Sequence, residues 1–478
     1  MKVFKNYLLN SAYQLLLVFI PLITIPYISR ILGDRGIGLN AFTLAIVQYF
    51  ILAGSIGITT YGNREIAYNQ GDKKKRSQIF WEISFLRFFT IALSISAFVV
   101  FLSFQTSNFY IYLLQGIAIL AAAFDISWYF MGMENFKRTV TRNFMVSLLS
   151  IVLIFLFVNT VDDLPLYILI VTGSALIGNL SLWPFLTKEI FGPDWRNLKI
   201  QRHLYPTLML FLPQIATQVY IVVNKNMIGI FDSIIAVGFF AQSDSITRVS
   251  LALVTSLGTV MLPHVSSMHA KGDLDGIKKM LEKSFDVMTG LSIPIMFGIM
   301  AISLNFAPLF FGVDFRVVGV LMMMQAPIIV AIAWSNVLGV QYLLPLNKMR
   351  QFTTSVTIGA ILNVILNLVL LPIFGVFGAM FATILAEFSV TIYQMRAVRN
   401  EIKIKRLFGG VWKYFFSGFI MFLVVFGLNQ YWPSSYIALI IQVIIGFLIY
   451  LLMNILFKTT MYQEVRGLAL SMKKKEVR

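Results

Sequence analysis

A few charged side chains lie within or at the ends of long apolar stretches of the sequence. A charge in hydrocarbon costs roughly 3 kcal/mol or more, so charges found there are where function is expected. Basic side chains at such positions can hold a ligand, and acids can couple to a proton or a cation. The basic candidates for substrate binding are Arg30, Arg87, Lys225 and Arg248, and the acids are Asp125, Asp244, Asp286 and Glu387.

Asp244 and Arg248 stand four residues apart, which places them on one face of a helix and lets them pair. Two interpretations stay open. The pair either neutralises itself and helps helices pack, or it exchanges its internal partner for a substrate or an ion. The second interpretation makes Asp244 a candidate for ion coupling, together with Asp125 and Glu387.

The remaining charges also have two interpretations each. Glu387 lies mid-stretch with no partner nearby in the sequence, so it is either a coupling acid or a hydrogen-bonded neutral acid. Lys225 lies between two asparagines and is expected in a cleft, although its long stem can also snorkel outward. Arg87 either snorkels or contacts ligand, and Arg30 is either interfacial or placed at the outer mouth of a cleft.

The composition requires lipid as the surrounding solvent. The 478 residues are 58% hydrophobic and 12% charged, with a mean hydropathy of +0.81. Such a chain cannot hide its apolar surface in a water-soluble core. The net charge of +17 comes from loops beside the membrane, so we expect no nucleic-acid partner.

Fourteen stretches are long enough to cross a bilayer as helices, which takes about 20 apolar residues each. The sequence therefore predicts an all-α polytopic membrane protein. Lys and Arg gather in every second gap between the stretches, which indicates that both chain ends are cytoplasmic. The predicted spans are 6–29, 37–58, 80–104, 108–131, 142–160, 165–187, 204–231, 234–262, 283–306, 318–343, 353–372, 374–396, 410–429 and 435–457.

The chain also matches itself at a shift near 200 residues. Six crossings return a chain to its starting side, so the two halves would form a parallel repeat. We expect one six-helix lobe over 1–200, a second over 201–405, and two further helices with a basic tail over 406–478. The matches are Gly38 with Gly238, Ser55 and Gly57 with Ser256 and Gly258, Glu82, Ser84 and Phe85 with Glu282, Ser284 and Phe285, and Arg142 with Arg350.

The sequence offers no sign of an enzyme. It has no glycine-rich loop followed by Lys and Ser or Thr, and no constellation of carboxylates or histidines that suggests catalysis. Cysteine is absent, and the three histidines at 203, 264 and 269 lie near the expected cytoplasmic ends of spans, so we expect no metal site. A secondary transporter is the remaining class.

The first 70 residues carry a pattern that resembles the N-terminal signature of bacterial O-antigen and capsule repeat-unit flippases. These belong to the multidrug, oligosaccharidyl-lipid and polysaccharide exporter superfamily. The fourteen spans, the cytoplasmic ends and the two lobes extend the resemblance over the whole chain. The pattern consists of Asn10, Tyr13, Pro21, Pro26, Tyr27, Ser29, Arg30, Leu32, Gly33, Gly36, Ile37, Gly38, Gln48, Tyr49, Gly57, Tyr61, Gly62, Arg64, Glu65, Ile66 and Ala67.

The resemblance implies a cargo and a location. The cargo is a short oligosaccharide linked through pyrophosphate to undecaprenol, carried by alternating access from the cytoplasmic to the periplasmic leaflet of the bacterial inner membrane. Arg87, Lys225 and Arg248 would hold the pyrophosphate, and Arg30 would receive it at the outer side. No cofactor is expected. Energy would come from a Na⁺ or H⁺ gradient, or from a periplasmic polysaccharide polymerase that removes the product.

Three alternatives stay open at this point. A drug and cation antiporter of the same superfamily would usually have twelve spans and lack the opening pattern. A flippase for the lipid-linked peptidoglycan precursor shares the fourteen-span plan. An integral membrane glycosyltransferase or polymerase would need a large outer loop or a cluster of acids and bases, and the outer loops here are short.

Overall fold

The chain is helical throughout the part that is described. The computed structural model describes residues 2–463 and 466, without the side chains of 2–21 and of parts of 212–221 and 256–270, and no strand occurs among them. This agrees with the all-α class expected from composition. The predicted basic tail at Lys473, Lys474 and Lys475 lies outside the described residues.

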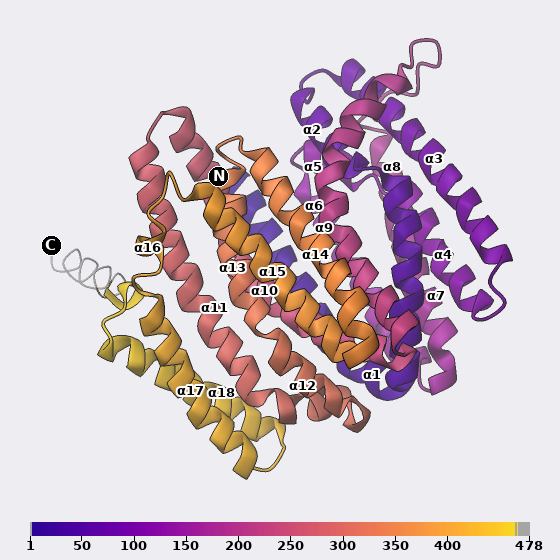
Figure 1. Ribbon diagram of the computed structural model, residues 1–478. Helices are drawn as coiled ribbons and strands as arrows, with labels where there is room; N and C mark the ends of the chain where they lie inside the picture. Colours follow the sequence, from indigo (N-terminus) through magenta and orange to yellow (C-terminus); the bar gives the residue numbers. More distant parts are fainter. Residues whose placement is uncertain (1, 464–465, 467–478) are drawn as a thin grey trace. The chain divides into compact units, whose positions relative to one another are not determined.

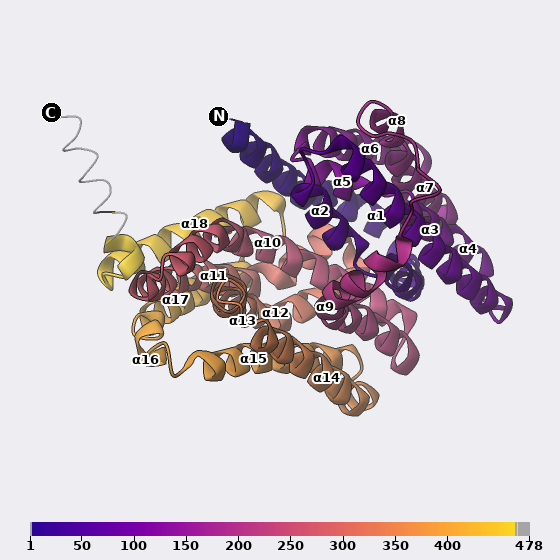
Figure 2. The ribbon, with the colours of Figure 1, turned by 90° about the horizontal axis from the view of Figure 1, so that it is seen from above.

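The chain divides into two compact units, Met1–Gly238 and Phe239–Arg478. The division predicted from the sequence, 1–200, 201–405 and 406–478, stays a prediction. The indigo and magenta helices of Figures 1 and 2 form the first unit. Its helices are α1 (Lys2–Ser55), α2 (Ile58–Tyr68), α3 (Lys73–Ser103), α4 (Phe109–Ala123), α5 (Ser127–Gly132), α6 (Phe136–Phe157), α7 (Leu164–Leu180), α8 (Trp183–Leu186) and α9 (Leu204–Phe231), with short 3₁₀ turns at Val161–Asp163 (η1) and Ile200–His203 (η2).

The longest helix of the first unit, α1, contains a break at Gly33. Its 54 residues would extend about 80 Å if straight, far more than a bilayer core of about 30 Å. Gly33 has φ 67° and ψ −178°, which only glycine adopts without strain. The break falls inside the predicted gap between the first two spans, so α1 supplies both of them.

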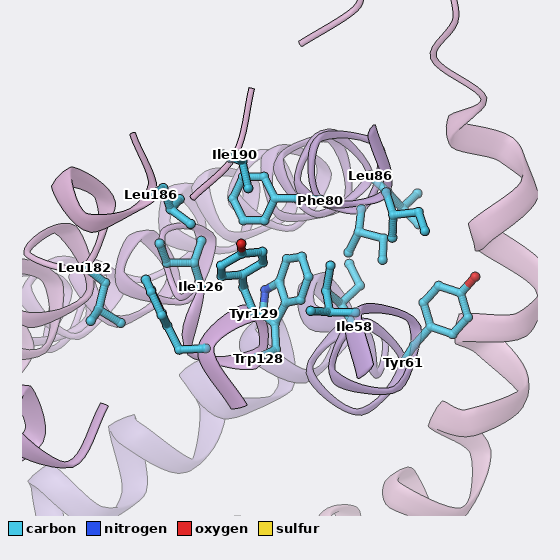
Figure 3. Close-up of a cluster of buried hydrophobic side chains, with 14 of the residues drawn as sticks. Ile58, Tyr61, Phe80, Leu86, Ile126, Trp128, Tyr129, Leu182, Leu186 and Ile190 are labelled. Carbon is cyan, nitrogen blue, oxygen red and sulfur yellow. The ribbon is translucent and has the colours of Figure 1, made fainter. Parts of the chain in front are cut away.

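An aromatic core holds the first unit together at α2, α3 and α5. Trp128 is fully buried and stacks on Phe80, with ring centroids 5.4 Å apart (Figure 3). A methyl group on Gly62 would lie 2.5 Å from the Trp128 ring, so only glycine lets α2 approach this closely. Gly57, just before α2, has φ 75°, which also favours glycine. Close packing at Gly62 and the positive φ of Gly57 thus explain two glycines of the N-terminal pattern.

The second unit contains the remaining helices. Figures 1 and 2 show α17 and α18 beside α11, and α14 and α15 packed as a pair. The helices are α10 (Ile234–Ala270, whose first turn belongs to the first unit), α11 (Leu274–Phe311), α12 (Arg316–Gln325), α13 (Pro327–Ser335), α14 (Met349–Phe374), α15 (Val376–Val398), α16 (Ile404–Leu407), α17 (Val411–Tyr431) and α18 (Tyr436–Leu456), with a 3₁₀ turn at Val313–Phe315 (η3) and a π-helix at Asn336–Leu343 (η4).

Many of these helices are long enough to span a membrane. Among the described residues, ten segments have the length and apolar character to cross, and the bent pair Val313–Gln325 and Pro327–Leu343 would make an eleventh. This shows a multi-pass membrane protein. The count of fourteen stays a prediction, since α9 and α10 are described only in part and α1 joins α2 in one segment, Leu22–Tyr68.

A clamp of three side chains joins three chain segments in the first unit. Glu189 follows α8, and its Oε1 lies 2.6 Å from a guanidinium nitrogen of Arg138 near the start of α6. The hydroxyl of Tyr129 in α5 donates to the other carboxylate oxygen over 3.4 Å.

The second unit contains a matching clamp. Glu401 follows α15, accepts a 2.7 Å hydrogen bond from the hydroxyl of Tyr342, and pairs with Lys348 just before α14. Each clamp thus has a tyrosine, a cation and a glutamate in the same chain order. An internal duplication of the chain, as predicted from the sequence, would produce this correspondence.

Candidate functional site

The structure brings together two candidates of the first unit, Arg87 and Asp125. A guanidinium nitrogen of Arg87 donates to the Asp125 carbonyl over 2.8 Å, and the second lies 3.7 Å from its carboxylate. The other carboxylate oxygen accepts the amide of Ser127 over 2.9 Å, at the start of α5. Only 4% of the Arg87 side chain is exposed. In this state Arg87 links α3 to the break between α4 and α5, and a ligand cannot reach its side chain.

The other two candidates of the first unit are more accessible. Arg30 is exposed and lies three residues before the break in α1. Lys225 in α9 is half-buried, between the buried side chains of Asn224 and Asn226. The side chains of Arg30 and Lys225 can therefore be reached from outside the unit, whereas that of Arg87 cannot.

In the second unit, Asp244 and Arg248 form the ion pair expected from their spacing. The Nε of Arg248 lies 2.6 Å from a carboxylate oxygen of Asp244, within α10. The two side chains differ in exposure, 49% for Arg248 and 15% for Asp244. Half of the Arg248 side chain is therefore accessible while it is paired with Asp244.

A glutamine at a helix bend supports this pair. Gln325 ends α12, where the chain bends by 43° into α13. Its amide nitrogen lies 3.4 Å from Asp244, and its amide oxygen accepts a 2.6 Å hydrogen bond from Ser243. Gln325, a neutral side chain at the bend, therefore helps to hold Asp244 in place.

Glu387 lies in a buried polar seam between α14 and α15. Asn363 donates to Thr383 over 3.5 Å, and Asn367 donates to Asn363 over 3.1 Å. Glu387 is 8% exposed and stands one helical turn beyond Thr383. Its spacing of four from Thr383 places Glu387 on the face of α15 that carries the seam. Further buried polar side chains on these two helices are Ser355, Thr391 and Gln394.

Sequence reasoning missed a buried cluster around Glu82. This carboxylate has no exposed surface and accepts hydrogen bonds from the backbone amide of Lys199 (2.7 Å) and Nε of Arg202 (2.9 Å). His203 Nε2 lies 2.7 Å from the same carboxylate, and its Nδ1 lies 2.7 Å from the hydroxyl of Tyr61. The only sequence signals were an acid at the start of an apolar span and a match to Glu282 in the repeat.

The contacts of His203 define its tautomer. A carboxylate only accepts, so Nε2 carries the proton toward Glu82 at 2.7 Å and cannot also accept from the Nε of Arg202, which lies 3.2 Å away. In the neutral ring Nδ1 then accepts from the tyrosine hydroxyl. Burial lowers the pKa of His203 below its ordinary value, and the nearby carboxylate opposes this shift without cancelling it. The imidazole is therefore neutral at pH 7.

The connection from α8 to α9 lies along α3. The hydroxyl of Ser77 accepts the amide of Phe191 over 2.9 Å, and the indole of Trp81 donates to the Phe191 carbonyl over 2.9 Å. Glu82, the residue after Trp81 in α3, binds Lys199 and Arg202 of the same connection. Side chains of α3 therefore bind most of the connection. The position of α9, which carries Lys225, thus depends on α3.

Two pairs of candidates form direct contacts, one pair in each unit. Arg87 meets Asp125, Asp244 meets Arg248, and Glu387 lies in its own seam. Within the described residues, no group of three or more His, Cys, Asp and Glu side chains is arranged to hold a metal ion.

Comparison with known proteins identifies a family and a relative that cover most of the chain. A family profile described as "Polysaccharide biosynthesis protein" matches residues 3–269, more than half of the chain. A protein of Escherichia coli named as an O-antigen transporter is 24% identical over 395 residues, covering 80% of this chain and 93% of its own.

Two solved structures share the fold. A lipid II flippase, MurJ, in an inward closed conformation has a TM-score of 0.73 and 15% identity, covering 95% of this chain and 99% of its own. An inward-facing multidrug transporter of the MATE family has a TM-score of 0.62 and 12% identity, covering 81% and 98%. At these identities the likeness shows the fold alone.

Proposed function

Because the chain belongs to the family of polysaccharide biosynthesis proteins, we propose that it flips lipid-linked oligosaccharide repeat units across a bacterial inner membrane. The observation that carries this proposal is the similarity to an O-antigen transporter over 80% of the chain. The fold is that of transporters, and the relatives are named for transport. The termini would lie in the cytoplasm, as the basic gaps indicate.

The proposed cargo is an oligosaccharide linked through pyrophosphate to undecaprenol. Its sugars and pyrophosphate cannot enter hydrocarbon unaided, whereas the prenyl chain can stay in lipid. The protein must then supply a polar surface with cations for the pyrophosphate. Arg248 suits this role because it is half-exposed and already carries a replaceable carboxylate partner.

The other basic residues take roles that follow from their exposure. Lys225 and Arg30 would contact the pyrophosphate, the first in mid-transport and the second at the outer side. Arg87 is closed to ligand while it pairs with Asp125, so it would act only in a state in which that pair opens.

Transport would proceed by alternating access as a secondary transporter. A Na⁺ or H⁺ gradient is the proposed energy source, with Glu387 and Asp244 as coupling acids. Protonation or cation binding at Asp244 would release Arg248 for the pyrophosphate, so one event would link the ion to the cargo. A polysaccharide polymerase on the outer side would draw the reaction forward by consuming the product.

The experiment is deletion of the gene in its own host, followed by measurement of surface polysaccharide and of the sidedness of lipid-linked repeat units. Deletion should remove the polymer and trap repeat units on the cytoplasmic leaflet. Wild type should restore both, and Arg248→Ala should not. Arg399→Ala is the matched control, an exposed arginine at the end of α15, and it should restore both.

Other results would overturn the proposal. Normal polymer with new sensitivity to cationic dyes would indicate a drug antiporter. Arrest of growth with accumulated peptidoglycan precursor would indicate a precursor flippase. Polymer of altered linkage, with repeat units already on the outer leaflet, would indicate an enzyme.

A further inference from the structure

Gln325 is a buried amide beside the ion pair of Asp244 and Arg248. Its side chain is 1% exposed, and the chain bends by 43° between α12, which it ends, and α13. Its amide oxygen accepts the hydroxyl of Ser243 over 2.6 Å, and its amide nitrogen lies 3.4 Å from Oδ1 of Asp244. The amide therefore directs its donor toward the acid and its acceptor away from it.

This orientation fits an ionised Asp244. The reverse orientation would place the amide oxygen against a carboxylate oxygen, and neither atom carries a hydrogen. The Nε of Arg248 lies 2.6 Å from the second carboxylate oxygen, Oδ2. Both oxygens of the acid thus face nitrogen donors. Within the described residues, Arg248 is the one charged side chain that contacts Asp244, and its other hydrogen-bonding partner is the neutral Gln325.

These partners do not suit a metal cation at Asp244. Hard cations are held by several oxygen atoms, about six for ions such as Ca²⁺ and Mg²⁺. The amide nitrogen of Gln325 and the guanidinium of Arg248 carry hydrogens toward the acid and cannot be ligands. The amide oxygen of Gln325 is engaged by Ser243. Even a reversed amide would add only one oxygen to those of the carboxylate, next to a positive guanidinium.

The same side chains can accommodate a proton. A carboxylic acid has one O–H group, which needs one acceptor. If the amide of Gln325 turns by 180°, its oxygen accepts from Oδ1 of Asp244 and its NH₂ group donates to Oγ of Ser243. Because an amide and a hydroxyl each donate and accept, both hydrogen bonds of Gln325 survive the turn. One proton from water adds to the carboxylate, no other covalent bond changes, and Arg248 loses its charged partner.

We propose that Asp244 binds a proton and not a sodium ion, and that Gln325 determines this choice by turning its amide when the proton binds. The inference rests on the proposed transport function and selects one of its two coupling ions. Gln325 is a positioning residue, because it acts on the ion through Asp244. Loss of the proton returns the amide to the observed orientation and restores the ion pair with Arg248.

The test uses the full chain purified in a mild detergent, with infrared difference spectra between neutral and acid pH. These spectra record the carbonyl stretch of protonated carboxylic acids. Wild type should show a band that Asp244→Asn removes. Gln325→Leu should move this band to higher frequency, because the acid then lacks its hydrogen-bond acceptor. Gln341→Leu is the matched control and should leave the band in place, since Gln341 is also 1% exposed and hydrogen-bonds a serine, Ser284, but its other partner is the neutral Asn336.

A second measurement addresses the ion directly. Replacing choline chloride by sodium chloride at equal ionic strength should leave the band unchanged, and loss of the band in sodium would overturn the proposal. So would the absence of a band that Asp244→Asn removes, or an equal shift in Gln341→Leu and Gln325→Leu. If Gln325→Leu does not fold, Gln325→Asn withdraws the amide by one methylene and should shift the band in the same direction.

None of these spectra depends on transport. Normal surface polymer after deletion of the gene would reject the proposed function and leave the spectra unaffected. A sodium-sensitive band together with loss of polymer after deletion would reject the proton at Asp244 alone.

Discussion

Gly38 and Gly238, which match each other in the predicted repeat, lie in backbone contact in the first unit. A methyl group on Gly238 would lie 3.1 Å from the α-carbon of Gly38. A methyl group on Gly38 would lie 1.9 Å from the carbonyl oxygen of Ile234. The second half of α1 and the first turn of α10 therefore cross without any intervening side chain, at the point where the chain leaves the first unit.

This crossing predicts that Gly38→Ala destabilises the protein. The added methyl group strikes a backbone carbonyl, so the helices must separate, at a cost of about 1–3 kcal/mol. Thermal unfolding in detergent measures the effect. Gly173→Ala in α7 is the control, because a methyl group there meets no atom within 4 Å. It should be neutral or stabilising by up to about 1 kcal/mol. Equal behaviour of the two variants would contradict the close crossing.

Glu82→Gln should destabilise the protein more than Glu282→Gln. The first removes a buried charge acceptor for Lys199, Arg202 and His203, which is worth about 1–3 kcal/mol. The second disturbs a 4.0 Å pair between Glu282 and the 65% exposed Arg406, which is worth less than about 1 kcal/mol. Chemical unfolding of the purified variants gives both values. Glu282→Gln, at the position that matches Glu82 in the predicted repeat, is thus the control. A larger loss of stability in Glu282→Gln than in Glu82→Gln would show that the buried cluster does not stabilise the protein.

Stability should fall in mild acid because of His203. Its pKa in the folded protein lies below that of the unfolded chain, about 6.5, so the unfolded state binds the proton more readily. The stability present above pH 6.5 is then lost as pH falls through the folded pKa. The melting temperature should therefore decrease between pH 7.5 and 5.5 in wild type.

Two variants test whether His203 causes this fall of the melting temperature in acid. His203→Gln should be less stable at pH 7.5 but should lose most of this pH dependence. His269→Gln should keep it. An unchanged pH profile in His203→Gln would assign the effect to other groups.

Tyr342→Phe should weaken the clamp of the second unit. Burial tends to raise the pKa of Glu401, but hydrogen bonds from Lys348 and Tyr342 outweigh burial and lower it overall. Loss of the tyrosine hydroxyl should cost about 1 kcal/mol at pH 7. Tyr129→Phe should cost less, because the hydrogen bond that it removes is 3.4 Å long, compared with 2.7 Å for that of Tyr342. Thermal melts at pH 7 compare the two, and a larger loss for Tyr129→Phe would contradict the clamp geometry.

Contacts within one helix could be predicted from the sequence. The pairing of Asp244 with Arg248 follows from a spacing of four, and the structure confirms it at 2.6 Å. The break in α1 falls at a glycine inside a predicted gap. Hydropathy likewise indicated membrane helices, because the length of an apolar stretch is a local property.

Contacts between helices could not be predicted in this way. Arg87 and Asp125 were both identified as unusual charges, but their 38-residue separation carries no sign that they pair. The Glu82 cluster joins residues 120 apart and was missed, because the position of Glu82 and its match to Glu282 carry no sign of its partners.

The sequence by itself determined the helical class, the membrane environment, the family pattern and the identity of the unusual charges. Each of these depends on composition, on periodicity or on a short run of residues. The tertiary structure alone decided which charges are buried in pairs, which are exposed, and at which glycines two helices approach closely. These properties arise from packing between distant segments, and the electrostatic cost of a charge depends on the neighbours that packing brings to it.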